Sequence, residues 1–197
     1  MKLSRQAWVS IRAMIVFTVV LGMLYPAVIW VAGLAMPAQS NGSLVRQNGQ
    51  VVGSSLIGQS FTDEKGNALP EWFQSRPSAA GAGYDGSASS GSNDGPENKN
   101  LISAITQRQA AIEKIDGVTV DRIPADAVTA SASGLDPDIS QAYALIQVDR
   151  VARARGLSTD LVRALVEKHV DGRPLGYLGE PTVNVLQLNI ALAALKP

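Results

Sequence analysis

A glycine-rich stretch has the spacing of a loop that binds nucleotide phosphates: Gly53 and Gly58 enclose four residues. In such loops a lysine follows the second glycine and reaches the β- and γ-phosphates. Gln59 occupies that position here, and its amide carries no positive charge. We therefore interpret the stretch as a glycine-rich exit from a strand and not as a nucleotide site.

His169 is the only histidine in the chain, and it follows a segment that we expect to be helical. An imidazole at the end of a helix can satisfy free carbonyls and interact favourably with the helix dipole. Catalysis would also require a serine and a carboxylate held against the ring, and the chain has no G-x-S-x-G motif. The pattern favours a capping role for His169.

A cluster of arginines, Arg150, Arg153 and Arg155, lies at the end of another expected helix. Cations there oppose the negative end of the helix dipole, which is sufficient reason for their presence. A patch that binds carboxylates is the functional alternative.

Two acids, Asp136 and Asp138, follow Ser131 and Ser133 and could together offer oxygen ligands to a cation. They lack the six-ligand spacing of a calcium loop. A turn and a helix cap are the interpretation we favour. The sequence therefore predicts neither a catalytic site nor a metal site.

Composition excludes several classes of site. With no cysteine, the chain has no disulfides, no thiolate metal ligands and no cysteine nucleophile. A single histidine excludes zinc sites that need two or three imidazoles. The 17 basic and 17 acidic residues give zero net charge, which argues against binding to nucleic acid.

The strongest feature of the sequence is an apolar stretch at residues 13–36, within a segment that has no charge between Arg12 and Arg46. As a helix, 24 residues extend about 36 Å, enough to cross a hydrocarbon core of about 30 Å. Small residues before Met36 fit a cleaved signal peptide loosely, but signal cores run only about 7–15 residues. We therefore predict a retained transmembrane helix, kinked at Pro26.

Basic residues set the expected orientation, because Lys2, Arg5 and Arg12 precede the span and no cation follows it closely. We expect residues 1–12 to be a cytoplasmic tail and residues 37–197 to form an extracytoplasmic domain on a single-pass protein of the cell inner membrane. Four residues share one face of the span at helical spacing and would let a partner helix approach closely: Thr18, Gly22, Pro26 and Gly33.

The external domain is predicted to be α+β, mostly helical, with a small β-hairpin or sheet. Asn48-Gly49 is typical of a two-residue type I′ turn, in which both positions need positive φ. Helices are expected over residues 99–115, 139–155 and 159–169, and after Pro181. Residues 78–98 are rich in glycine and serine, and their composition alone favours a flexible linker over an ordered loop pinned by Tyr84 and side chains such as Asn93 and Asp94.

The chain resembles the C subunit of the Kdp high-affinity potassium-transporting ATPase almost from end to end. The resemblance rests on long irregular motifs in fixed order: LYP (24–26), QSNGS (39–43), GSSLIGQ (53–59), FQSRPSAAG (73–81), YD (84–85), SGSNDGP (90–96), TASASGLDP (129–137), QVDRVA (147–152) and GEPTVNVL (179–186).

This resemblance implies a non-catalytic subunit with no cofactor of its own. It implies that a channel-like chain selects potassium, that a P-type pump chain hydrolyses ATP with magnesium, and that a small membrane peptide stabilises the complex. The C subunit would hold the two large chains together in the lipid bilayer and raise the affinity of the pump for ATP. An extracytoplasmic domain could raise the affinity of the pump for ATP only allosterically.

The resemblance also implies that the glycine- and serine-rich loop is ordered and belongs to a surface that contacts the partner chains. Its candidate residues are Arg76, Pro77, Ser78, Tyr84, Asn93, Asp94, Pro96, Ser133, Asp136 and Glu180. Two other functions remain open: an anchored hydrolase that uses serine, aspartate and His169, and a solute-binding or adhesion domain.

Overall fold

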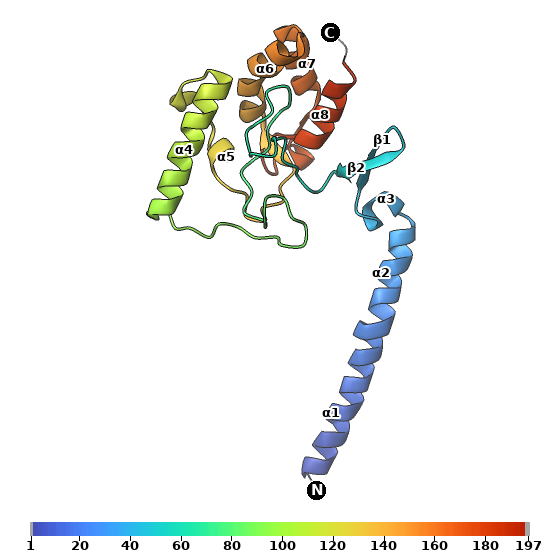
Figure 1. The fold of residues 1–197 in the computed structure, drawn as a ribbon. Helices are drawn as coiled ribbons and strands as arrows, with labels where there is room; N and C mark the ends of the chain where they lie inside the picture. Colours follow the sequence, from blue (N-terminus) through green and yellow to red (C-terminus); the bar gives the residue numbers. More distant parts are fainter. Residues whose placement is uncertain (1, 196–197) are drawn as a thin grey trace. The chain divides into compact units, whose positions relative to one another are not determined.

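A computed structural model describes residues 2–195 (Figure 1). The chain separates into two compact units, one ending at Leu44 and the other beginning at Val45. The first is helical and the second combines helices with short antiparallel strands, so the α+β prediction is confirmed.

The N-terminal unit is dominated by one long apolar helix. It comprises α1 (Lys2–Val19), the π-helical turn η1 (Val20–Leu24) and α2 (Tyr25–Leu34), and a short helix, α3 (Pro37–Ser40), follows. The stretch Leu3–Leu34 has 32 residues and is long and apolar enough to cross a membrane. At 1.5 Å per residue it extends about 48 Å, which exceeds a hydrocarbon core of about 30 Å. The segment 1–12 is thus helical from Lys2 and continuous with the span.

The π-helical turn lies immediately before Pro26. The Tyr25 N–H donates to the carbonyl of Val20, five residues earlier, where an α-helix would use the fourth. Proline has no N–H, and in an α-helix its ring collides with the carbonyl four residues before it. Widening the turn by one residue relieves this conflict, so the helix absorbs Pro26 with a π turn at the place where the sequence predicted a kink.

The predicted hairpin is confirmed. Strands β1 (Leu44–Gln47) and β2 (Gln50–Ser54) pair with each other, and the turn between them has φ values of 51° at Asn48 and 82° at Gly49. Both central residues therefore have the positive φ that a type I′ turn requires.

A three-stranded antiparallel sheet lies within the body, and the positions of its strands were not predicted. Its order is β3 (Asp138–Ser140), β5 (Thr182–Asn184) and β4 (Val170–Asp171). Ser140 and Asn184 also accept hydrogen bonds from the first turns of the helices that follow them. The prediction that a helix begins at Ile139 is wrong, because Ile139 pairs with Val183 and the helix begins after the Ser140 cap.

Helices surround this sheet (Figure 1). The longest, α4 (Lys99–Asp116), begins at the predicted Asn98 cap and ends at Gly117. The others are α6 (Gln141–Arg155), α7 (Thr159–Lys168) and α8 (Val185–Ala193), with α5 (Ala125–Val128) and two 3₁₀ turns, η2 (Val120–Arg122) and η3 (Pro174–Gly176).

The core forms where α6, α7, α8 and the sheet meet. Its fully buried side chains include Phe73, Ile139, Val148, Val151, Val162, Val166, Val183, Leu188 and Leu192. Phe73 comes from the irregular segment between β2 and α4, which anchors the loops described next.

Candidate partner-contact surface

The glycine- and serine-rich loop is fixed against a second loop of the body. The Ser131 N–H donates to the carbonyl of Pro77 at 3.2 Å, and the Ser90 N–H donates to the carbonyl of Ser133 at 3.0 Å. The Ser78 hydroxyl donates to the carbonyl of Gly134 at 2.6 Å. Such backbone pairing over residues 77–90 contradicts the flexible linker that composition favoured and agrees with the ordered loop that the resemblance implied.

We call this region the loop cluster (residues 76–91 and 131–138). At its centre, side-chain bonds connect Arg76, Tyr84 and Asp136. Arg76 Nη1 lies 2.7 Å from Asp136 Oδ2. The Tyr84 hydroxyl donates to the carbonyl of Arg76, and the Tyr84 N–H donates to Ser78 Oγ at 2.9 Å. Burial, reinforced by the charge of Asp136, raises the pKa of Tyr84 to about 12. The phenol therefore remains a neutral donor at physiological pH.

Two glycines allow the loops to approach this closely. A Cβ on Gly134, whose φ is +68°, would lie 2.6 Å from the carbonyl oxygen of Ser90. A Cβ on Gly58 would lie 2.3 Å from the ring of Tyr84 and 2.6 Å from the carbonyl oxygen of Asp136. Such distances are well inside van der Waals contact, so a side chain at either position would force the loops apart.

A hollow of about 410 Å³ opens beside the cluster and contains the glycine-rich stretch. The residues that line it are Gly53, Ser54, Ile57, Gly58, Gln59, Ser60, Gly83, Tyr84 and Gly86. The Gln59 amide donates to the carbonyl of Val52 at 2.7 Å. Gln59 thus has a structural partner in β2, and the residues that line the hollow include no lysine or arginine.

Six of the ten candidate contact residues belong to the loop cluster: Arg76, Pro77, Ser78, Tyr84, Ser133 and Asp136. Asn93, Asp94 and Pro96 lie apart from it, just before α4, where Asp94 accepts a hydrogen bond from the Asn98 side chain. Glu180 is on a different loop, where it pairs with Arg173. The structure therefore distributes the candidates over three places.

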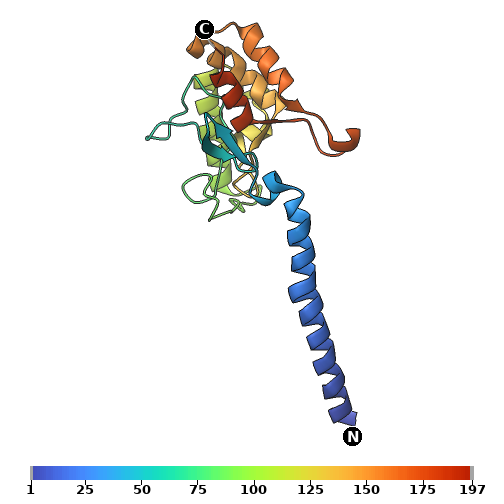
Figure 2. The same ribbon diagram turned by 90° about the vertical axis from the view of Figure 1, so that its right-hand side faces the viewer.

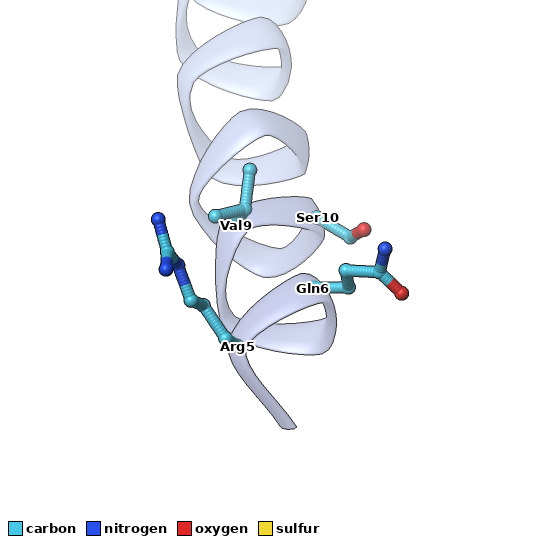
Figure 3. Close-up of a pocket in the computed structure, with 4 residues that line it drawn as sticks. All are labelled: Arg5, Gln6, Val9 and Ser10. Carbon is cyan, nitrogen blue, oxygen red and sulfur yellow. The ribbon is translucent and has the colours of Figure 1, made fainter. Parts of the chain in front are cut away.

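The proposed packing face of the long helix remains a prediction. Thr18, Gly22 and Pro26 are exposed in the N-terminal unit, and Gly33 is half-buried because Ser40 of α3 lies over it. Nearer the start of α1, Arg5, Gln6, Val9 and Ser10 line a shallow hollow on a single helix (Figure 3). Gln6 and Ser10 lie one turn apart in that view, and Arg5 projects away from them.

The remaining sequence candidates have structural roles. His169 ends α7, and its Nδ1 lies 2.8 Å from the carbonyl oxygen of Leu165, as a capping residue does. Asp136 closes a turn by accepting from the Asp138 N–H at 3.1 Å, and Asn184 donates to Asp138. Burial and the charge of Asp136 raise the pKa of Asp138. Between Lys2 and Leu195, no group of three histidine, aspartate or glutamate side chains could hold a metal ion.

Arg150 lies in the protein interior, so the dipole interpretation and the open carboxylate patch are both wrong for it. Only 4% of its side chain is exposed, and its Nε lies 2.7 Å from Asp116 Oδ1. Its Nη1 donates to the carbonyls of Pro70 and Trp72 at 2.7 and 2.8 Å. Arg150 thus fixes the segment that leads into the loop cluster.

Sequence reasoning missed the polar residues around this arginine. Gln147 accepts from Arg150 and from the Gln74 N–H, each at 2.7 Å, while Asn189 bonds both backbone groups of Phe73. A signal was present, since Gln147 and Arg150 are three residues apart on a helix and share the face that carries the apolar core residues.

Comparison with known proteins identifies relatives of this chain. The family model described as KdpC, the c chain of the K⁺-transporting ATPase, matches residues 7–194. The chain belongs to the KdpC family. A potassium-transporting ATPase KdpC subunit of Kineococcus radiotolerans is 50% identical over 195 residues, covering 99% of this chain and 96% of the relative. The corresponding subunit of Herpetosiphon aurantiacus is 52% identical over 189 residues, covering 95% of each chain.

The match confirms the family to which the sequence motifs pointed. The family match, over residues 7–194, includes most of the long apolar helix, the loop cluster and α8. A KdpC subunit of Mycobacterium tuberculosis is 48% identical over 190 residues, covering 95% of this chain and 97% of that one. The chain is thus a subunit of a potassium-transporting ATPase.

Proposed function

We propose that this chain is a non-catalytic, single-pass assembly subunit that joins the channel-like potassium chain to the ATP-hydrolysing chain. The single long apolar helix crosses the inner membrane with its N-terminus in the cytoplasm. The body from Val45 onward lies on the extracytoplasmic side. Potassium, ATP and magnesium are handled by the partner chains, and a small membrane peptide and the surrounding lipid complete the assembly.

The observation that carries this proposal is the end-to-end match to KdpC subunits, combined with loops that are rigid because their polar groups bond one another. Side chains that bond each other in this way hold a shape, and shape complementarity is what an assembly surface needs. His169, the residue on which a hydrolase would depend, bonds the carbonyl of Leu165.

An effect on ATP affinity would be transmitted through the membrane helix. A body outside the cytoplasm cannot touch a nucleotide held in the cytoplasm. It can raise ATP affinity only if it binds two conformations of the pump unequally and shifts their populations. The membrane helix, with its face of Thr18, Gly22, Pro26 and Gly33, is the element through which that preference would act.

The proposal is tested by affinity purification through a tag on the ATP-hydrolysing chain, with and without this subunit. We expect the channel-like chain to be lost from the purified complex when the subunit is deleted and to return when it is supplied again. Equal recovery without the subunit would refute the assembly role. His169→Ala is the control variant: we expect full potassium transport, whereas an anchored hydrolase would lose its activity.

The ATP effect is tested on the same preparations by the Michaelis constant for ATP. We expect the constant to be lower in the complete complex than in the pump chain alone. An unchanged constant would remove the allosteric part of the proposal and leave the assembly role in place.

A further inference from the structure

The chain contains the dipeptide Asn-Gly twice, at Asn41-Gly42 and at Asn48-Gly49. Asparagine is among the thermolabile residues of proteins, because its side-chain amide can be attacked by the backbone nitrogen of the next residue. Glycine in the next position makes this attack easiest, since it has no side chain that hinders the approach or restricts the backbone. The structure places the two dipeptides in different surroundings, and these surroundings determine which of them reacts.

Asn41 is held against the short helix α3. Its Nδ2 donates to the Pro37 carbonyl at 2.7 Å, and its backbone N–H donates to the same carbonyl at 3.2 Å. The attacking group would be the Gly42 nitrogen, whose N–H donates to the Gln39 carbonyl at 3.1 Å. Both reacting groups are therefore already engaged, and these hydrogen bonds must break before the groups can meet.

Asn48 and Gly49 form the exposed tip of the hairpin. The tip projects from the body on the right of Figure 1, and the strands that carry it, β1 and β2, lie toward the viewer in Figure 2. Within residues 2–195, neither the Asn48 amide nor the Gly49 N–H has a hydrogen-bond partner. A Cβ on Gly49 would meet no atom within 4 Å, so water reaches both reacting groups.

The hairpin can also open locally without loss of the core. Its two strands have four and five residues, pair with each other, and contribute no side chain to the hydrophobic core. A two-stranded hairpin of this kind is only marginally stable in water. Local opening frees the ψ angle of Asn48, which must rotate before the Gly49 nitrogen can reach the Asn48 Cγ.

We propose that Asn48 is a site of spontaneous deamidation, with water as the co-reactant. The Gly49 nitrogen loses its proton to hydroxide and attacks the Asn48 Cγ. A C–N bond forms, the Cγ–Nδ2 bond breaks, and Nδ2 takes a proton from water and leaves as ammonia. A water molecule then opens the resulting succinimide ring. Cleavage of the new N–Cγ bond gives aspartate, whereas cleavage of the original peptide bond gives isoaspartate.

Both products change the hairpin. Each replaces a neutral amide by a carboxylate close to Arg46, whose Nη1 donates to the Gly49 carbonyl at 3.2 Å. Isoaspartate also adds a backbone carbon to the turn, and the lengthened turn no longer has the type I′ geometry that aligns β1 with β2. The inference does not depend on the assembly function, because the reaction needs only the folded chain and water.

Peptide mapping of the full-length, detergent-solubilised chain tests the proposal. Trypsin cleaves after Arg46, which places Asn41 and Asn48 on separate peptides. After incubation at mildly alkaline pH, the mass change from amide to carboxylic acid gives the deamidated fraction of each peptide, relative to a sample digested without incubation. We expect Asn48 to react at least about tenfold faster than Asn41, because each hydrogen bond that must break slows the reaction by up to about tenfold. Similar rates at the two positions, faster reaction at Asn41, or no reaction at Asn48 would overturn the proposal.

Two controls separate the effect of the fold from that of the sequence. In concentrated urea the hydrogen bonds at Asn41 are lost, so we expect the two rates to become similar. A difference that persists in urea would show that neighbouring residues, and not the fold, determine the rate, and would overturn the proposal. Asn48→Gln should abolish the mass change in its peptide, because glutamine must close a larger ring. A mass change that remains would assign the reaction to a glutamine and would likewise overturn it.

Discussion

Replacing Asp116 by alanine is expected to destabilise the body strongly, because it leaves the buried Arg150 charge without its carboxylate. The two side chains are only 4% and 3% exposed, and their 2.7 Å contact is the charged part of the network that holds residues 69–74. Removing one partner of a buried ion pair costs about 3–5 kcal/mol. For a body of this size, about 2–4 °C of melting temperature is lost per kcal/mol, so a fall of about 6–20 °C follows.

Thermal unfolding of the detergent-solubilised chain can be followed by the fluorescence of Trp72, which lies 4.9 Å from the guanidinium of Arg155 in a cation–π contact. Trp8→Phe and Trp30→Phe make Trp72 the only tryptophan of the chain, which has three. Asp149→Ala is the matched control on α6, since Asp149 is exposed and its loss should change stability by less than about 0.5 kcal/mol.

A double variant, Asp116→Leu with Arg150→Met, separates the charge effect from lost packing. Removing both charges avoids a buried unpaired ion, so the double variant should be more stable than the sum of the single effects predicts, by about 1 kcal/mol or more. Two results would contradict this role of the buried network. One is an unfolding free energy of Asp116→Ala within about 1 kcal/mol of that of the unchanged chain. The other is additivity of the effects of Asp116→Leu and Arg150→Met on the unfolding free energy.

Three further predictions concern the loop cluster and its neighbours. Gly134→Ala should destabilise the body by about 2–4 kcal/mol in urea unfolding, because of its left-handed φ and the close loop contact, whereas Gly172→Ala, with open space around it, should have little effect. Tyr84→Phe should cost about 1 kcal/mol through the lost bond to the Arg76 carbonyl. Since the folded pKa of about 12 exceeds the ordinary 10.0, the unchanged chain should lose stability as pH rises from 10 to 12. Tyr84→Phe should show a smaller loss, to which the buried Tyr143, whose pKa is also raised, still contributes. Equal pH profiles would contradict the burial of the Tyr84 phenol. The folded pKa of Asp138 is also raised above 3.8, so its protonated form favours folding at low pH and its contribution declines as pH rises through and above that value. In urea unfolding, the free energy of unfolding of Asp138→Asn should therefore lack this declining contribution as pH rises through and above 3.8. If the variant and the unchanged chain show the same dependence of unfolding free energy on pH, the raised pKa of Asp138 is contradicted.

The parts of the fold that depend on local chemistry were predictable from the sequence. Asn98 and Gly117 bound α4 as expected, and Asn48-Gly49 formed the hairpin turn. The long apolar helix follows from composition and length alone. Each of these features requires residues that are near one another in the chain, so a sequence pattern is sufficient to reveal it.

The sheet and the buried polar network were not predictable, because their partners are distant in the sequence. Ile139 pairs with Val183, in strands too short to show alternation. Arg150 donates a hydrogen bond to Asp116, which is 34 positions away in the sequence, and the Asn189 side chain donates to the Phe73 carbonyl, 116 positions away. Composition also gave the wrong prediction for the loop after Ser78, because this loop is ordered by contacts with residues distant in the sequence. Its glycines permit close packing, and a Cβ on Gly91 would lie 2.8 Å from the Ala132 carbonyl oxygen.

The candidate contact residues were only partly recoverable. Arg76, Ser78, Tyr84 and Asp136 form one cluster, although nothing in their spacing indicates this, and it was the family motifs that selected them. The exposure of Leu175, Tyr177 and Leu178, in the loop between β4 and β5, was not predicted, because these residue types usually belong to the core. Only the structure reveals that they are exposed.

Cysteine labelling can determine on which side of the membrane the body lies. The chain has no cysteine, so one introduced thiol reports one position. We predict that Glu167→Cys, at an exposed position of α7, reacts with a membrane-impermeant maleimide on spheroplasts, while Gln6→Cys, on α1, reacts only after the membrane is permeabilised. Labelling of Gln6→Cys on sealed spheroplasts with protection of Glu167→Cys would place the body in the cytoplasm and contradict the account.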